Sequence, residues 1–167
     1  MPRARATARR PAKRPAARAG ALSAERAELL RRWCVVASAL FTLLGVAIAL
    51  GAAGPALDLW FDALGRRFFP SGPTPEILAV RDFLLGPLGA TIAARWLLMA
   101  WLFHEPIRRG EPWAHRAATW SLWGWFVLDS GVSAWQRAWF NVALVNVWPM
   151  LLVGVPLHLM RRRPSRG

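Results

Sequence analysis

Thiols, phenols and lysine amines are almost absent from this chain of 167 residues. It has one cysteine, Cys34, one lysine, Lys13, and no tyrosine. A single cysteine cannot form a disulfide within the chain, which excludes the two-thiol chemistry of membrane disulfide oxidoreductases. We interpret Cys34 as a small structural residue, with palmitoylation as the alternative. Arginine in place of nearly every lysine, beside many Ala, Gly and Pro residues, indicates a GC-rich genome, so the choice of arginine carries little chemical information.

Signatures of catalysis are also missing. The sequence has no Gly-rich phosphate loop, no nucleophile beside a plausible base and no zinc-ligand spacing. Ser130 and Ser133 lie close to Asp129 in the sequence, but no histidine is expected at their depth, which argues against a serine triad. We identify no catalytic residue and expect no cofactor. Whether the chain is an enzyme stays open, and the sequence favours a protein that is not.

Charge is missing from four long stretches, although the chain carries a net charge of +13. The stretches are Trp33–Leu57, Phe83–Phe103 with only Arg95, Ala117–Gln136 with only Asp129, and Ala138–Met160. A helix that crosses the hydrocarbon core needs about 20 apolar residues. The sequence therefore predicts an all-α fold, a bundle of four transmembrane helices. We place the spans at about 33–55, 83–103, 117–136 and 138–160, within one membrane domain of residues 33–160.

Basic residues are distributed unevenly around these spans. Seventeen lie in residues 1–32, in the loop between the second and third spans, or in residues 161–167, and four lie in the other loops. The positive-inside rule places both termini in the cytoplasm. We expect a bacterial cytoplasmic (inner) membrane, with residues 1–32 as a disordered basic tail and residues 161–167 as a second basic tail.

The N-terminal tail has further interpretations. It is expected to contact anionic lipid headgroups, and it lacks the interleaved aromatic residues that would indicate nucleic-acid binding. The first span could instead be a cleaved secretory signal, and residues 2–24 could be an organelle transit peptide.

The first external loop contains a second kind of helix. Apolar residues recur there at helical spacing: Leu57, Trp60, Phe61, Leu64 and Phe68. This pattern predicts a short amphipathic helix that lies in the outer membrane interface.

Small residues at a spacing of four predict close helix packing. They are Gly45 and Ala49 in the first span, and Gly86, Ala90 and Ala94 in the second, with Gly89 and Ala93 alongside. In the fourth span, Pro149 and Pro156 each remove a backbone donor, which predicts a kink or an irregular turn. A homo-oligomer is compatible with these patterns.

Polar residues inside the predicted spans are the candidates for function, because buried charge is costly. At about 1.5 Å per residue, Asp129 and Asn146 are expected at one depth outward of the midplane, and Arg95 slightly inward. We predict a cluster of Arg95, Asp129 and Asn146. However, Arg95 points almost opposite the small residues of its own helix, so it could face a second neighbour, a subunit interface or lipid.

The residues around Asp129 suggest two roles for such a cluster. Its face of the helix is shared by Leu122, Trp125, Phe126 and Ser133, which are possible pocket-lining residues. The side chains of the cluster could pair with one another and fix the register of the helices. Alternatively, they could hold a cation, a proton or an amphipathic ligand.

Three histidines are expected on the inner side: His104, His115 and His158. Two of them on facing helices could ligate haem b, but imidazoles at an interface are ordinary, so they are weak haem candidates. No metal site is expected.

From about Phe83 onward the chain resembles a group of short four-span bacterial inner-membrane proteins without an assigned activity. The matching pieces are LGPLGAT at 85–91, RRGEPWA at 108–114, WFVLDS at 125–130, Phe140-Asn141 with Asn146, and Pro156-Leu157. The likeness covers roughly half of the chain and excludes the Arg-rich N-terminus. It implies the topology and points to Asp129, Asn141 and Asn146, and it implies no reaction.

Three functions remain open from the sequence. The first is a binding or assembly component of the membrane. The second is a small transporter or proton-coupled carrier that uses the polar cluster. The third is a haem- or quinone-binding redox subunit.

Overall fold

The computed structural model describes residues 24–51 and 54–160, and within them it contains helices and no strand. The first four helices are α1 (Ala24–Ala49), α2 (Gly54–Phe68), α3 (Pro75–His104) and α4 (Pro112–Trp135). A continuous helical stretch follows: α5 (Trp139–Asn141), η1 (Val142–Asn146), α6 (Val147–Pro149), η2 (Met150–Gly154) and α7 (Val155–Met160). The expected all-α fold is confirmed for the described residues.

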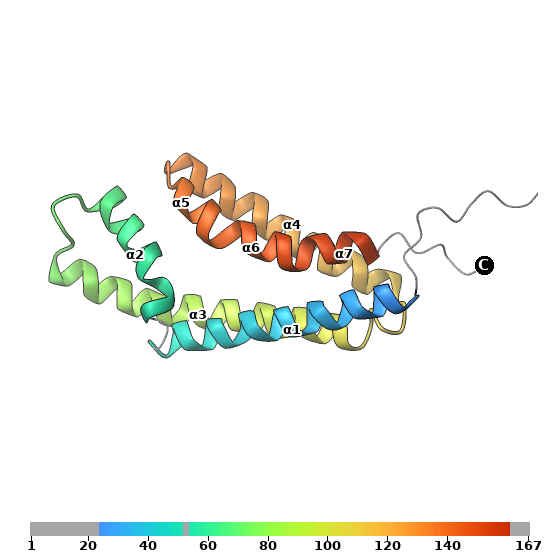
Figure 1. Cartoon of the computed structure of the whole chain (residues 1–167). Coiled ribbons are helices and arrows are strands. Elements are labelled where there is room, and N and C mark those ends of the chain that lie inside the picture. Colours follow the sequence, from blue (N-terminus) through green and yellow to red (C-terminus); the bar gives the residue numbers. More distant parts are fainter. Residues whose placement is uncertain (1–23, 52–53, 161–167) are drawn as a thin grey trace, which may run out of the picture.

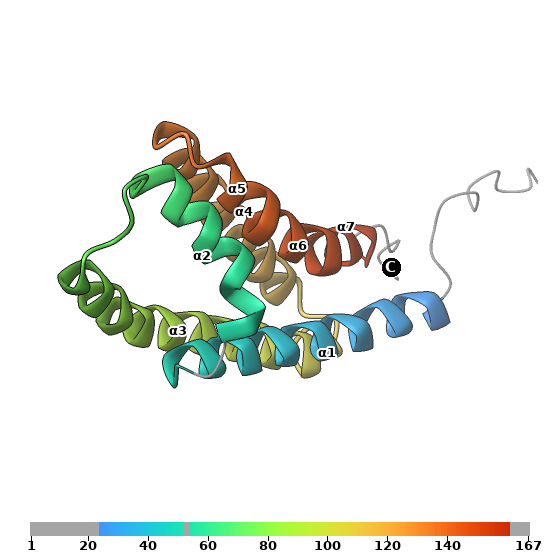
Figure 2. The same ribbon diagram turned by 60° about the vertical axis from the view of Figure 1, so that its left-hand side comes forward.

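The helices form two antiparallel pairs. Figure 1 shows α1 lying along α3, and α4 lying along the stretch from α5 to α7. The two pairs approach each other where α1 contacts η2 and α7. At the other end α2 leans toward α5, and Figure 2 shows it between α3 and the second pair. The short helix expected in the first external loop is therefore present as α2.

Three helical stretches are long and apolar enough to cross a membrane: α1, α3 and Trp139–Met160. Large apolar side chains project outward from them, among them Leu40, Leu43, Leu97 and Leu98. Such a surface is suited to lipid rather than water. The predicted span 117–136 lies in α4, which has 24 residues but is not among these three because tryptophans and polar residues interrupt its apolar run.

Two element boundaries differ from the expected ones. α1 begins at Ala24, so residues 24–32 are helical, and the prediction of disorder through residue 32 is wrong there. Glu28 stabilises this extension, because its carboxylate pairs with Arg31 and Arg32 one helical turn away. α3 begins at Pro75 rather than near residue 83. Residues 1–23 and 161–167, which include most of both predicted basic tails, lie outside the described part of the chain.

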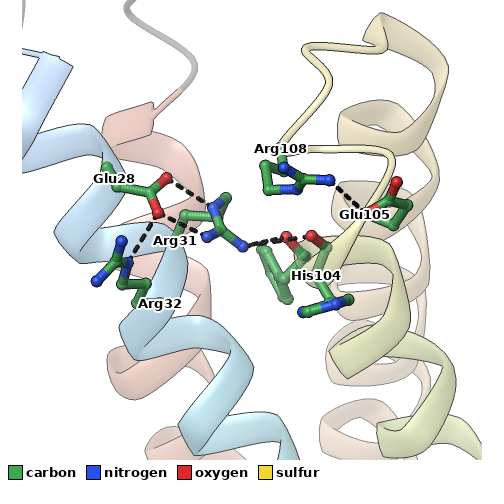
Figure 3. A network of polar contacts seen from close by, with 7 residues as sticks. Glu28, Arg31, Arg32, His104, Glu105 and Arg108 are labelled. Carbon is green, nitrogen blue, oxygen red and sulfur yellow. Dashed lines mark hydrogen bonds and ion pairs between the residues drawn. The ribbon is translucent and has the colours of Figure 1, made fainter.

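Arg31 connects α1 to the end of α3, as Figure 3 shows. Its Nη1 donates to the carbonyl oxygen of Phe103 at 2.9 Å, and at 3.5 Å to that of His104. The last carbonyls of a helix have no partner within the helix. Arg31 therefore caps the C-terminus of α3 with a nearly buried cation, which is also favourable to the helix dipole.

The tight packing of α1 against α3 depends on two glycines. A Cβ atom added to Gly45 would lie 2.5 Å from the backbone nitrogen of Ala93, and one added to Gly89 would collide with the backbone of Ala49. Expected small-residue packing is therefore present. The row Gly86, Ala90 and Ala94 does not form it: Ala90 and Ala94 are exposed, and Gly86 has open space beside it.

The last helical stretch contains two π-helical turns, in accord with the irregular turn expected from its prolines. In η1 the N–H of Val147 bonds to the carbonyl of Val142, and in η2 that of Val155 bonds to Met150. Each turn includes the residue whose carbonyl lies four positions before a proline. This residue is Val145 for Pro149 and Leu152 for Pro156. A proline ring clashes with that carbonyl in an α-helix. The wider π turn accommodates the ring without ending the helix.

Candidate functional site

One carboxylate oxygen of Asp129 accepts hydrogen bonds from three side chains. Asn141 donates to Asp129 Oδ1 from Nδ2 at 2.8 Å, and Asn146 does so at 3.0 Å. The hydroxyl of Ser133, one turn along α4, lies 3.3 Å from the same oxygen. The structure thus brings Asp129, Asn141 and Asn146 together between α4 and the last helical stretch. We call these three residues with Ser130 and Ser133 the Asp129 cluster.

The serines extend the hydrogen bonding within the cluster. Asn141 Nδ2 also donates to Ser133 Oγ at 2.9 Å, and Asn146 Nδ2 donates to Ser130 Oγ at 3.0 Å. Each asparagine therefore bridges the aspartate and one serine of α4. A buried polar network of this kind fixes the rotation of one helix against another.

The π turn η1 explains how both asparagines reach one aspartate. Asn141 and Asn146 are five residues apart, and at about 100° per residue an α-helix would place them roughly 140° apart. In a π turn residue i bonds to residue i+5, so residues five apart lie one above the other. The turn that accommodates Pro149 also aligns the two amides toward Asp129.

Helix α2 covers the cluster at Asn141. The indole Nε1 of Trp60 donates to Asn141 Oδ1 at 2.9 Å. Because an indole N–H only donates, this bond fixes the Asn141 amide with its Nδ2 toward Asp129. Arg67 of α2 adds a second bond, from Nη2 to the carbonyl oxygen of Gln136 at 2.9 Å.

Two acceptor atoms of the cluster have no hydrogen-bond partner among the described residues. Asn146 is fully buried, and its Oδ1 has no partner. Asp129, by contrast, is only partly buried, and its Oδ2 accepts no hydrogen bond from residues 24–51 and 54–160. A buried acceptor without a partner, such as Asn146 Oδ1, is rare in native structures. Together the two acceptors offer a carboxylate and an amide oxygen to a cation or a hydrogen-bond donor.

Arg95 is not part of this cluster. Its guanidinium lies 4.7 Å from the centre of the Trp125 ring and 5.1 Å from that of Trp96, and Nη2 donates to the carbonyl oxygen of Ser121 at 3.2 Å. No ion pair joins Arg95 to Asp129 in the part of the chain that is described. Of the alternatives left open by the sequence, Arg95 faces a second neighbour, α4. Stacking on indole rings stabilises a cation where water is scarce.

The four expected pocket-lining residues have separate environments. Ser133 belongs to the Asp129 cluster, and Trp125 holds Arg95. Leu122 is fully buried in the apolar core, and Phe126 packs edge to face against Trp123. The structure therefore does not assemble them into one aromatic pocket around Asp129.

The three histidines lie at one end of the molecule, near the end of α3, the start of α4 and the end of α7, but they are not gathered into one site. His115 Nε2 lies 2.9 Å from the carbonyl oxygen of Leu157, whereas His104 and His158 are exposed. Among the described residues no group of three or more His, Cys, Asp or Glu side chains is placed to hold a metal ion.

Sequence reasoning missed two features of the site. Trp60 was expected only as part of an amphipathic helix, and its indole N–H gives no signal for a specific partner. Asn141 came from the resemblance alone, because an α-helical projection separates it from Asn146. The five-residue spacing before Pro149 is the pattern that could have revealed the π turn.

Comparisons with known proteins give no relative from which a role could be transferred. No family model matches the chain, and neither a curated protein nor a solved structure matches it.

Proposed function

We propose that this chain is a four-span integral membrane protein that acts as a binding component, with the Asp129 cluster as its binding site. α4 is the fourth span in this proposal, and both termini lie in the cytoplasm of a bacterium. The cluster then lies in the outer half of the membrane beneath α2. Resemblance to short four-span inner-membrane proteins supports the same topology.

The observation that carries the proposal is the carboxylate of Asp129 among apolar helices, with three donors on one oxygen and none on the other. Neutral amide donors stabilise negative charge without neutralising it. An anionic group without a cationic partner in an apolar setting is costly to maintain. A ligand that supplies a positive charge or an N–H group offsets that cost.

A second candidate is a small carrier. Hydrogen bonds run without interruption from Trp60 in α2 through Asn141 and Asp129 to Asn146. This path links the outer interfacial helix to the fully buried amide. The path favours a carrier for a small cation. A redox subunit is less well supported, because the histidines do not gather into a haem site.

Replacement of Asp129 by Asn separates a binding role from a structural one. The introduced amide keeps an acceptor oxygen for Asn141 and Asn146, so the variant should fold, with a loss of about 1 kcal/mol. Small molecules and lipids that co-purify would be compared by mass spectrometry. We expect a species held by the wild-type protein to be lost from Asp129→Asn.

Asp62→Asn is the matched control, because Asp62 is an exposed carboxylate of α2. It should leave the co-purifying species unchanged. If Asp129→Asn only lowers the thermal midpoint and holds the same species as the control, the cluster is structural and the proposed binding role is wrong.

A further inference from the structure

A separate cavity lies at the opposite end of the molecule from the Asp129 cluster. It has a volume of about 840 Å³ and lies between the first turns of α1, the loop 105–111, the first turns of α4 and the end of α7. Small-molecule sites typically have volumes of about 300–1,000 Å³. The cavity is therefore large enough for a phospholipid headgroup.

A cation and two indoles follow one another along the α4 wall of this cavity. Arg116, Trp120 and Trp123 are at positions i, i+4 and i+7, so they share one face of the helix. Trp120 is 76% exposed and Trp123 is 50% exposed. The wall thus runs from a charged group at the helix start to bare aromatic surface deeper along the span.

Arg116 is the cation of the cavity that is available to a ligand. Arg31 is committed to Glu28 and to the end of α3. Arg108 pairs with Glu105 at 2.9 Å. The hydrogen bonds from Arg108 and Arg109 lower the pKa of Glu105, so its carboxylate stays charged and Arg108 stays paired with it. Arg116 is exposed and forms no ion pair with any residue of the described ranges.

The start of α4 adds to the positive potential. Glu111 precedes the helix but makes no capping bond to it, because its carboxylate accepts from the indole Nε1 of Trp113. The N–H groups of the first turn therefore have no side-chain cap, and a helix N-terminus attracts anions. The other carboxylate of the lining, Glu28, is occupied by Arg31 and Arg32.

We propose that this cavity binds one anionic phospholipid, with its phosphate on Arg116 and its acyl chains along Trp120 and Trp123. Basic pockets between helices at the charged end of membrane proteins bind such headgroups. The occupant has an anionic head and an apolar tail because the wall has a cation followed by indoles. A free phosphate would use the cation and leave the indoles without a role.

Native mass spectrometry of the full-length protein in detergent tests the proposal. Phosphatidylglycerol, phosphatidylcholine with the same acyl chains, and inorganic phosphate would each be titrated. We expect phosphatidylglycerol to be retained preferentially, and Arg116→Gln to lower its occupancy about fivefold. Arg66→Gln, the same change on exposed α2 at the other end of the molecule, should have no effect.

Trp120→Ala provides a second variant that changes no charge. It should lower the retention of both lipids, because the chain contact is shared. Equal retention of the two lipids would overturn the proposal, and so would equal effects of Arg116→Gln and Arg66→Gln. Inorganic phosphate that displaces phosphatidylglycerol at comparable concentration would identify a free phosphate as the ligand and would also overturn it.

Discussion

Two side chains that carry charge within the apolar helices, Arg95 and Asp129, are surrounded by neutral groups. Arg95 lies between the rings of Trp96 and Trp125, and Asp129 accepts from two amides. Cation–π contact and charge-assisted hydrogen bonds each stabilise a charge without an opposite charge. Both side chains can therefore be retained independently, and neither depends on the other for its place in the fold.

Trp60 is the residue that connects α2 to the Asp129 cluster. Trp60→Phe removes the donor to Asn141 Oδ1 and leaves that oxygen without a partner, so we expect a loss of about 1–2 kcal/mol. For a chain of this size that corresponds to a fall of roughly 2–8 °C in thermal midpoint. Faster hydrogen exchange in α2 should accompany the fall, because its docking on α5 is weakened.

Trp135→Phe is the control for this prediction. Trp135 is 86% exposed and has no hydrogen bond from its indole to a described residue. The same truncation there should leave the thermal midpoint within about 1 °C, in line with surface substitutions. An equal effect of the two changes would show that the Trp60 bond contributes nothing.

The position of a residue in its helix could be predicted from the sequence, but its partner on another helix could not. Asp129 and Asn146 followed from polarity and depth, which are properties of one span at a time. Arg95 could be placed in its helix but not given a partner, because the crossing of α3 and α4 sets which carbonyl and which rings it meets. The partner of Trp60 required the position of α2, which no local pattern supplies.

At the scale of elements, the contact of α1 with α3 depends on backbone proximity. Gly89→Leu should destabilise the protein by about 1–3 kcal/mol or more, because its side chain would enter the backbone of Ala49. The measurement is the thermal midpoint in detergent, together with the monodispersity of the sample on size exclusion.

Gly86→Leu adds the same side chain one turn earlier in α3, where nothing lies within 4 Å. It should be tolerated, because leucine also favours the helix over glycine. Comparable losses for Gly86→Leu and Gly89→Leu would contradict the observed helix contact.

The π turn η1 makes a prediction about deletions. Removing Ala143 shortens the spacing of Asn141 and Asn146 to four, which keeps both on one face of a regular α-helix. Combined with Pro149→Ala, which removes the ring that the wide turn accommodates, the deletion should be tolerated. Folded yield and thermal midpoint check this.

Deletion of Leu98 in α3 is the matched control. Leu98 is exposed, but it lies in regular α-helix, so the residues after it would rotate by about 100° and lose their packing. That variant should not fold. A folded Leu98 deletion, or an unfolded Ala143 deletion, would show that the π turn does not have the proposed role.

The helices themselves were largely predictable, and their irregularities were not. Hydropathy located α1, α3 and the final stretch because apolar length is a local property. Both rows of small residues in α3 were predicted, but the spacing rule could not show that Gly89 and Ala93, rather than Gly86, Ala90 and Ala94, form the contact with α1. The π turns could be predicted only by considering each proline together with the carbonyl four residues before it.

For the whole molecule, four of the described arginines lie at the end where α2 lies, and six lie at the end where α1 begins and α7 ends. Arg31, Arg108 and Arg116 line one cavity there, whereas the Asp129 cluster lies at the other end under α2. This polarity matches an orientation with both termini in the cytoplasm. In that orientation the proposed lipid site faces the inner leaflet and the polar cluster faces the outer one.

The most direct test is cysteine labelling of intact cells with a membrane-impermeant maleimide. The native Cys34 is fully buried, so the unchanged chain is the blank. If α4 crosses the membrane, Ser71→Cys and Gln136→Cys should be labelled from outside, and Arg109→Cys should be labelled only after the cells are opened. Labelling of Arg109→Cys in intact cells, or protection of Gln136→Cys, would contradict a four-span protein with its polar cluster on the outer side.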